Sequence, residues 1–191
     1  MSLRLVAVVG IGAVLLAAGI ASPSTVLAPT FTELIDNARE IFIGETVSRY
    51  SHWVDTPDGR AIVTLVTFRV DESLKGGLQT QTSLEFLGGT VGETTLRVSG
   101  APEFSVGDRD ILFVGNRNAI SPVMGLGYGR FRVLRDPRRA IDEVRFSDGA
   151  ALESTTFVGR PRSQSLRSTP SLSLEAFRQE IRQRLDNPGP R

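Results

Sequence analysis

The run of alternating residues from Ala61 to Val114 constrains the fold more than any other part of the 191-residue chain. Polar and apolar residues alternate in four short segments, 61–70, 80–87, 94–98 and 110–114, and Gly-rich turns separate these segments. Alternation with a period of two is typical of half-buried β-strands. The last segment, DILFV, is apolar on both faces, which predicts a strand that is covered on both sides.

Further strand patterns flank this run. Residues 41–53 form a strand pattern with a bulge or bend expected at Gly44, and the turn residues of 55–59 join this strand to 61–70 as an antiparallel hairpin. Residues 122–135 predict a strand or strand pair with glycines at alternate positions, and 140–146 predict a weaker strand. The apolar face expected for the first strand consists of Ile41, Ile43, Val47 and Trp53.

Two segments have the spacing of helices. Residues 30–39 predict a short helix with Thr30 or Thr32 as its N-cap, and 171–186 predict an amphipathic C-terminal helix capped by Ser171 or Ser173. The apolar stripe of the second helix is Leu174, Phe177, Ile181 and Leu185. Between the domain and this helix, residues 147–170 are polar and rich in Ser and Arg, and we expect a flexible linker; residues 187–191 form a tail.

The predicted fold class is mainly β. The number of short strands favours a small antiparallel barrel over a sandwich, closed or partly open and OB-like, and we expect it to span residues 30–146. A closed sheet has no exposed edges, and bends at Gly44 and in the glycine row Gly125 to Gly129 would supply its corners. The short N-terminal helix and the C-terminal amphipathic helix complete the predicted domain.

The N-terminus predicts export. Arg4 precedes an apolar run from Leu5 to Ile20, and small residues near Ala21 suit cleavage by a signal peptidase, with Ala28 as a second cleavage position. We therefore expect a signal peptide over 1–21, a linker over 22–29, and a mature protein that is periplasmic or secreted. An uncleaved membrane anchor is the alternative, although the run is shorter than the roughly 20 residues that span a bilayer.

Charge and cysteine content exclude several classes of protein. The chain has 22 basic and 21 acidic residues, and loss of the signal peptide would remove only Arg4, so the mature protein has no basic excess for nucleic acid. No cysteine is present, which excludes disulfides, thiolate catalysis, cysteine zinc sites and a lipoprotein anchor. We expect no nucleic acid partner, and contact with a membrane only through the N-terminal segment if it stays uncleaved.

The residues that carry acid–base chemistry are few. His52 is the only histidine, so a Ser-His-Asp arrangement would have to use it, but we expect a solvated edge position near a hairpin end. Carboxylates are paired at Asp71–Glu72, Asp108–Asp110 and Asp142–Glu143. Neighbouring strand residues point to opposite faces, and Asp108 follows Gly107 in a turn, so shared protons are not expected. We expect no catalytic residue, no metal site and no cofactor.

Two groups of residues are candidates for binding. Gly-rich loops between the strands would flank a binding mouth. The loop of residues 88–92 lacks the helix or lysine of a phosphate-binding loop. The candidate binding loop comprises Gly88, Gly89, Thr90, Gly92, Glu93, Pro102 and Phe104. The second candidate is a basic and aromatic patch of Tyr128, Arg130 and Arg132, which suits an anionic polymer; an ordinary solvated strand face explains it too.

The chain resembles a group of uncharacterised exported bacterial proteins over about residues 30 to 135. The segments that carry the resemblance are Ile41–Gly44, Phe68–Val70, Leu74–Gly76, Val106–Asp108 and Leu112–Val114. More distantly, the order of helix, long hairpin and Lys-Gly turn is similar to the netrin-like modules of tissue metalloprotease inhibitors, which are OB-type barrels. Those inhibitors reach the catalytic zinc with an N-terminal cysteine that this chain lacks, so the resemblance implies the barrel and a protein-binding role only.

These observations lead to one expectation and two alternatives. We expect an exported, non-enzymatic β-barrel module that binds an unknown protein or cell-envelope component. The first alternative is a netrin-like protease inhibitor. The second is a hydrolase that uses His52 or one of the acidic pairs.

Overall fold

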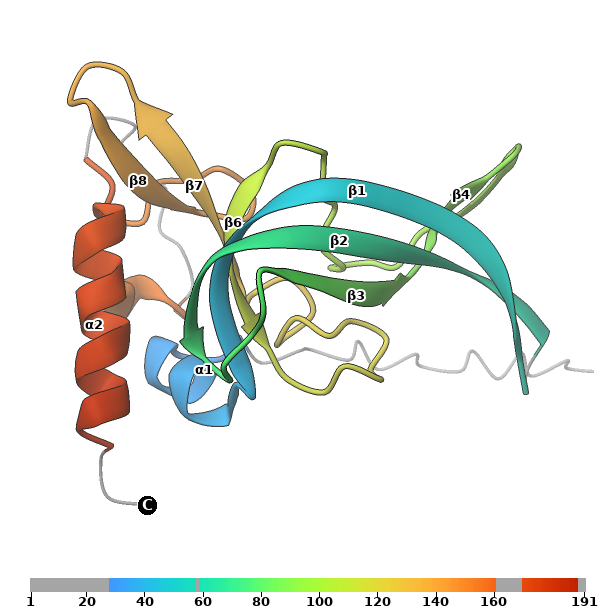
Figure 1. Ribbon diagram of the computed structural model, residues 1–191, viewed down its shortest axis with the longest axis horizontal. Coiled ribbons are helices and arrows are strands. Elements are labelled where there is room, and N and C mark those ends of the chain that lie inside the picture. Colours follow the sequence, from blue (N-terminus) through green and yellow to red (C-terminus); the bar gives the residue numbers. More distant parts are fainter. Residues whose placement is uncertain (1–27, 58, 161–169, 189–191) are drawn as a thin grey trace, which may run out of the picture.

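The computed structural model describes residues 28–57, 59–160 and 170–188. The predicted signal peptide and most of the predicted linker over 22–29 lie outside these residues. The described part of the chain is mainly β (Figure 1). Its elements are α1 (Phe31–Asn37), β1 (Glu40–Thr56), β2 (Gly59–Lys75), β3 (Gln81–Leu87), β4 (Gly89–Val91), β5 (Thr94–Leu96), β6 (Arg109–Val114), β7 (Arg130–Asp136), β8 (Ile141–Phe146), a 3-10 helix (Thr155–Phe157) and α2 (Leu174–Asp186).

Among the described residues, six strands form one antiparallel sheet in the order β3-β2-β1-β6-β7-β8, and β4 and β5 form a separate hairpin. The predicted hairpin of β1 and β2 is confirmed, and its two strands of 17 residues each curve across the molecule (Figure 1). In the described part of the chain, no helix is long and apolar enough to cross a membrane.

The register of β1 against β2 has irregularities that decide which side chains share a face. One lies between Ile43 and Gly44, where the extra residue is Asp71 of β2 and not a residue of β1, and another leaves Val47 of β1 without a partner between Thr46 and Ser48. An extra residue in a strand reverses the alternation beyond it. For this reason the prediction that Trp53 shares the face of Ile43 is wrong, and Trp53 is 37% exposed on the opposite face.

Both faces of the sheet carry a hydrophobic core. On the face covered by the helices, the core consists of residues such as Ile41, Ile43, Ile111, Phe113, Phe131, Val144, Phe177 and Ile181. On the other face it consists of Phe42, Val66, Phe68, Leu84, Phe86, Phe104, Leu112, Val114 and Val123. The segment from Asp110 to Val114 is buried at every position, which confirms the prediction of a strand covered on both sides.

Side-chain caps hold both ends of α1. Thr30 and Glu33 form a capping box, in which the Thr30 amide donates to Glu33 Oε2 at 2.8 Å and the Thr30 hydroxyl accepts from the Glu33 amide. At the other end, Lys75 Nζ donates to the carbonyl oxygens of Ile35 at 2.8 Å and Asp36 at 3.3 Å. A cation at the last carbonyls of a helix is favourable, so Lys75 ties the end of β2 to α1.

The C-terminal helix α2 packs against the core on the helix-covered face of the sheet, called the first core below. Ser173 is its N-cap, as one of the two predictions has it, and accepts from the Ala176 amide. The ring of Phe177 is fully buried and lies 5.0 Å from the ring of Phe31 and 5.1 Å from that of Phe131. The helix is therefore part of the domain core.

Ion pairs add to this docking. Glu72 forms ion pairs with Arg178 at 2.8 Å and with Arg182 at 2.5 Å. Arg184 donates two hydrogen bonds to the carboxylate of Asp36 in α1. The hydrogen bond from Arg184 lowers the pKa of Asp36. Solvent screens these partly exposed pairs, so each contributes little to stability while fixing where α2 lies.

The sheet is open, and the closed barrel is not confirmed. The outer edges of β3 and β8 are instead covered by irregular segments. At β3, the Leu87 amide donates to the Ile120 carbonyl and Arg117 donates to a strand carbonyl. At β8, the Val144 amide donates to the Leu172 carbonyl. These contacts give part of each edge a partner outside the sheet, so the two edges do not have to pair with one another.

Two predicted segments differ from the structure. Residues 122–129 form turns instead of a strand, apart from one bridge of Val123 to β6, because the Gly129 amide donates to the Met124 carbonyl at 2.9 Å and closes the segment on itself. The predicted linker is wrong over residues 147–160, where Leu152 and Val158 are buried in the first core. Residues 161–169 of that linker lie outside the described residues.

Candidate functional site

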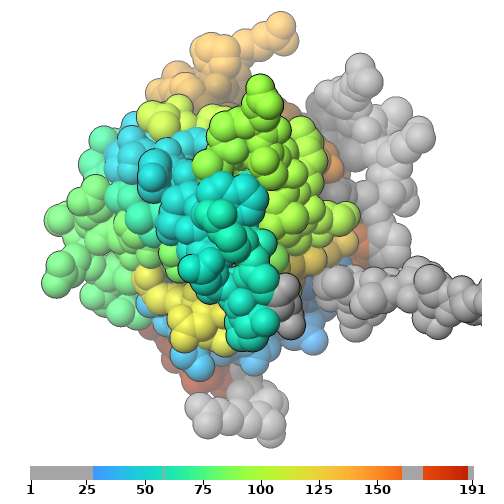
Figure 2. Space-filling view, turned by 90° about the vertical axis from the view of Figure 1, so that its right-hand side faces the viewer, coloured from blue at the N-terminus to red at the C-terminus, as the bar shows by residue number. Residues whose placement is uncertain are grey.

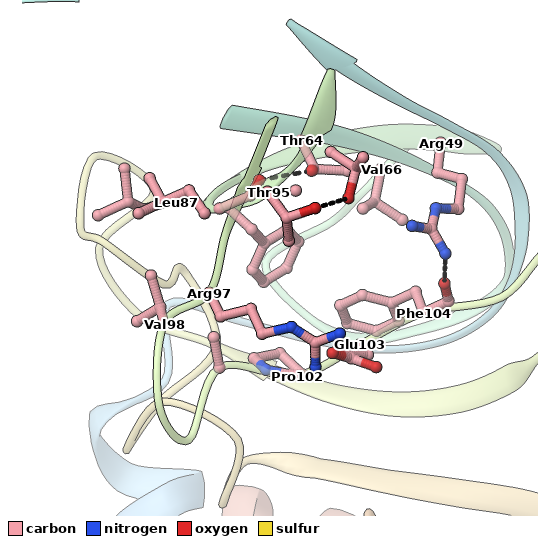
Figure 3. Close-up of a pocket in the computed structure, with 16 residues that line it drawn as sticks. Arg49, Thr64, Val66, Leu87, Thr95, Arg97, Val98, Pro102, Glu103 and Phe104 are labelled. Atoms are coloured by element: carbon pink, nitrogen blue, oxygen red, sulfur yellow. Dashed lines mark hydrogen bonds between the residues drawn. The ribbon is translucent and has the colours of Figure 1, made fainter. Parts of the chain in front are cut away.

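A pocket of about 260 Å³ lies between the β1–β2 hairpin, the β4–β5 hairpin and the segment 97–104 (Figure 3). Seen from the end of the molecule where β1 turns into β2, the tip of that hairpin (teal) lies beside the light-green segment that contains β4 and β5 (Figure 2). The pocket is lined by Arg49, Thr64, Val66, Phe86, Leu87, Gly88, Gly89, Thr90, Thr95, Leu96, Arg97, Val98, Ala101, Pro102, Glu103 and Phe104.

One wall depends on the close approach of β4 to the β1–β2 hairpin. Thr64 Oγ1 donates to the Gly88 carbonyl at 2.6 Å and lies 2.8 Å from Ser51 Oγ. A Cβ at Gly89 would lie 2.2 Å from Thr64 Oγ1 and 2.5 Å from Ser51 Oγ, and the φ of Gly89 is +133°. Only glycine suits both the conformation and the contact. The glycine pair therefore holds the β4–β5 hairpin against the sheet.

The floor of the pocket is apolar and aromatic. Val66, Phe86 and Phe104 are each at most 4% exposed. The ring of Phe104 lies 5.2 Å from that of Phe68 and 5.1 Å from that of Phe86, and the guanidinium of Arg130 lies over the Phe104 ring, 4.4 Å from its centroid. Aromatic and cation–π contacts of this kind fix the ring, so the floor is rigid.

Behind the floor is a buried ion-pair cluster. Arg130 donates through Nε and Nη2 to the two oxygens of Asp110 at 2.9 and 3.0 Å, and through Nη2 to Asp108 at 3.1 Å. It also donates to the Glu103 carbonyl, and Arg132 binds Asp108 at 3.1 Å. Burial raises the pKa of the fully buried Asp110, and the charge and hydrogen bonds of Arg130 act in the other direction. The cluster anchors the segment that carries Phe104.

The predicted basic and aromatic patch is not an exposed surface. Arg130 is 4% exposed and bound within the cluster, and Arg132 is half-buried against Asp108. Tyr128 is exposed, but it lies in the turns before β7 and not on the strand with the two arginines. Arg130 and Arg132 face Asp108 and Asp110 because the segment 97–108 folds over this part of β7. No local pattern in the sequence indicates this contact.

The rim of the pocket carries charge. Arg49 donates from Nη1 to the Phe104 carbonyl at 2.9 Å, and Arg97 extends toward Glu103 and Pro102 (Figure 3). Within the described part of the chain, neither Arg49 nor Arg97 forms an ion pair. Two guanidinium groups against the one carboxylate of Glu103 give the rim a positive balance.

The structure brings together most of the candidate binding loop. Five of its residues line the pocket, namely Gly88, Gly89, Thr90, Pro102 and Phe104, whereas Gly92 and Glu93 lie at the turn between β4 and β5 and do not. Sequence reasoning missed Arg49, Thr64 and Arg97. For Arg97 the available signal was its position directly after the β4–β5 hairpin.

His52 and the three acidic pairs, which were considered for hydrolysis, lie in separate surroundings in the structure. The ring of His52 stacks on Tyr50 at 5.5 Å, and its Nδ1 has no hydrogen-bond partner among the described residues. Asp71 binds Arg109, whereas Glu72 binds α2, and Asp142 binds Arg109, whereas Glu143 binds other arginines. Each carboxylate is thus paired with a cation, and the buried Asp110 is out of reach of a substrate in this structure.

Comparison of the chain with protein-family models, with curated protein sequences and with solved structures found no match. Within residues 28–57, 59–160 and 170–188, no group of three or more His, Cys, Asp or Glu side chains could hold a metal ion. The chemistry of the pocket is therefore the basis for a function.

Proposed function

We propose that the protein is an exported, non-enzymatic binding module that holds a protein or cell-envelope component at the pocket beneath the β4–β5 hairpin. The observation that carries this proposal is that two arginines without a carboxylate partner meet a preformed apolar floor in one pocket. Binding sites combine a largely apolar cavity with a few polar groups that orient the ligand. Export rests on the apolar run from Leu5 to Ile20 after Arg4.

The scaffold suits this role. A strongly curved sheet, with both edges covered and both faces packed, presents loops that are held rigidly at one end (Figure 1). We propose that this curved sheet is the partly open, OB-like barrel expected from the sequence. Binding on loops that a rigid scaffold positions is common in β-domains.

A capture experiment with two matched variants tests the proposal. Thr95 lines the pocket, while the adjacent Thr94 is exposed and does not. Thr95→Trp fills the pocket mouth, and Thr94→Trp adds the same side chain to the opposite face of β5. We expect the wild-type protein and Thr94→Trp to retain the same component from an envelope fraction, and Thr95→Trp to lose it.

The component should be recovered with an unchanged mass, because the proposal includes no turnover. Equal retention by all three proteins would show that the pocket is not the binding site. A component recovered in a chemically altered form would contradict the non-enzymatic part. Circular dichroism spectra of both variants control for folding.

A further inference from the structure

Most of the described arginines form ion pairs, from Arg60 in the β1–β2 hairpin to Arg184 in α2. Within the described residues, Arg39, Arg49, Arg97, Arg138 and Arg160 form none, and of these Arg49 and Arg97 line the same pocket. Two guanidinium groups without an ion-pair partner, against the single carboxylate of Glu103, leave the cavity with a positive balance that indicates a site for an anion.

The donors that remain free suit a carboxylate. Arg49 uses Nη1 for the Phe104 carbonyl and keeps its other N–H groups, and no described residue accepts a hydrogen bond from the Arg97 side chain. A guanidinium presents its donors in a planar fork that matches the two oxygens of a carboxylate. The hydroxyl groups of Thr90 and Thr95, which bond to each other at 2.9 Å, are further polar groups at the rim.

The floor specifies what the carboxylate is attached to. Val66, Phe86 and Phe104 present an apolar surface that an inorganic anion would leave unused. At about 260 Å³ the pocket lies just below the roughly 300–1,000 Å³ of small-ligand sites, so it has room for a group of about that size and not for a folded segment. In the last residue of a peptide, a carboxylate and a side chain are joined to the same carbon atom.

We infer that the pocket binds the free carboxyl terminus of a peptide whose last side chain is apolar. This inference rests on the proposed function and names the part of the partner that the pocket recognises. The carboxylate binds Arg97 and Arg49, the terminal side chain lies on Phe86 and Phe104, and the peptide leaves through the open mouth. Capture of a terminal carboxylate is a recurring mode of peptide recognition.

Two probes that differ only at the terminus test this inference: N-acetyl-Ala-Phe with a free carboxyl group, and the same dipeptide as its amide. We expect the acid to bind the full chain at least about tenfold more tightly than the amide, because only the carboxylate accepts charge-assisted hydrogen bonds from the two arginines. Calorimetry gives the affinities, and NMR shifts of the Thr95 and Leu96 amides report where the probes bind.

Substitutions separate the role of charge from that of position. Arg97→Gln and Arg49→Gln should each weaken binding of the acid about tenfold and leave binding of the amide unchanged. Arg138→Gln removes the same charge from an exposed arginine that lies away from the pocket, and it should change neither affinity. Binding of the acid should also weaken as salt rises, because ions screen exposed charges.

The outcomes distinguish this inference from the proposed function. Equal binding of acid and amide at the pocket would overturn carboxylate recognition while the proposed function stands. Free phenylalanine binding as tightly as the acetylated dipeptide would overturn the assignment to a peptide terminus. If neither probe shifts the Thr95 and Leu96 amides, the inference is wrong, and the capture experiment with Thr95→Trp still decides the proposed function.

Discussion

Replacing Arg130 with methionine is expected to destabilise the protein by an amount that depends on pH. The substitution leaves the carboxyl group of Asp110, which is fully buried, without the two hydrogen bonds at 2.9 and 3.0 Å and without the charge that compensates it. Removal of one partner of a buried ion pair costs about 3–5 kcal/mol when the other stays charged. Asp110 can avoid part of this cost by taking up a proton.

That proton sets a ceiling on the loss, and the ceiling can be calculated. An aspartate in an unfolded chain has a pKa near 3.9, so protonating it at pH 7 costs about 4 kcal/mol, at roughly 1.4 kcal/mol for each pH unit. At pH 5 the same protonation costs about 1.5 kcal/mol. Burial already raises the pKa of Asp110 against the opposing effect of Arg130, and loss of Arg130 raises it further. The folded state then binds the proton more tightly than the unfolded state, so stability rises as pH falls.

Urea unfolding at pH 7 and pH 5 measures this effect. We expect the loss in Arg130→Met to be up to about 2.5 kcal/mol larger at pH 7 than at pH 5, which is the difference between the two protonation costs; the lost contacts with Phe104 and the Glu103 carbonyl add the same amount at both pH values. The double variant Asp110→Asn/Arg130→Met is the control, because it has no carboxyl group at position 110 and should show the same loss at both pH values. The contact of Arg130 with Phe104 is lost in both variants and cancels from the comparison. A loss in Arg130→Met that is equal at the two pH values would refute the reasoning.

Three further predictions concern the contacts that hold the helices and the pocket. Lys75→Met should lower the free energy of unfolding by about 1–2 kcal/mol in urea titrations, because the last carbonyl groups of α1 lose their cation, and Lys75→Arg should recover part of it. Gly89→Ala should lower the unfolding temperature more than Gly92→Ala does: both positions have positive φ, but a Cβ at Gly92 meets open space. The hydrogen bond with Arg184 lowers the pKa of Asp36. The stability that the ionised Asp36 contributes is therefore present above its unfolded pKa of 3.8 and is lost as the pH falls through its folded pKa. Asp36→Asn should therefore lower the unfolding midpoint at pH 7, and the difference from wild type should vanish in strong acid.

Local patterns in the sequence predicted the parts of the fold that local physics determines. The capping box at Thr30, the cap at Ser173, the turn between β1 and β2 and the two-sided burial of β6 all follow from residues within a few positions of one another. A cap needs a side-chain oxygen at one position, and a buried strand needs apolar residues at successive positions. These features leave a signal that one sequence contains.

Contacts between distant segments explain the errors. The alternating glycines of 122–129 predicted one face of a strand. In the structure these residues form turns, and the backbone of Gly129 lies close to the Phe113 carbonyl. The polar segment 147–160 looked like a linker, yet Leu152 and Val158 fill the core beneath α2. A closed or partly open barrel was expected because closure removes exposed edges, and in the structure loops supply partners to part of each edge instead. None of these contacts leaves a periodic signal.

The candidate site shows both situations at once. Its glycine loop was predicted because turn chemistry is local, whereas Arg49 could not be assigned to it from the alternation of β1. Counted from Ile43, Arg49 belongs to the face covered by the helices, but the extra residue Val47 reverses the alternation and turns Arg49 toward Val66 and the pocket. The bulge also turns Ser51 to the same face, where it contacts the Thr64 hydroxyl that binds β4. One inserted residue therefore gives the pocket a guanidinium group and the support for its wall.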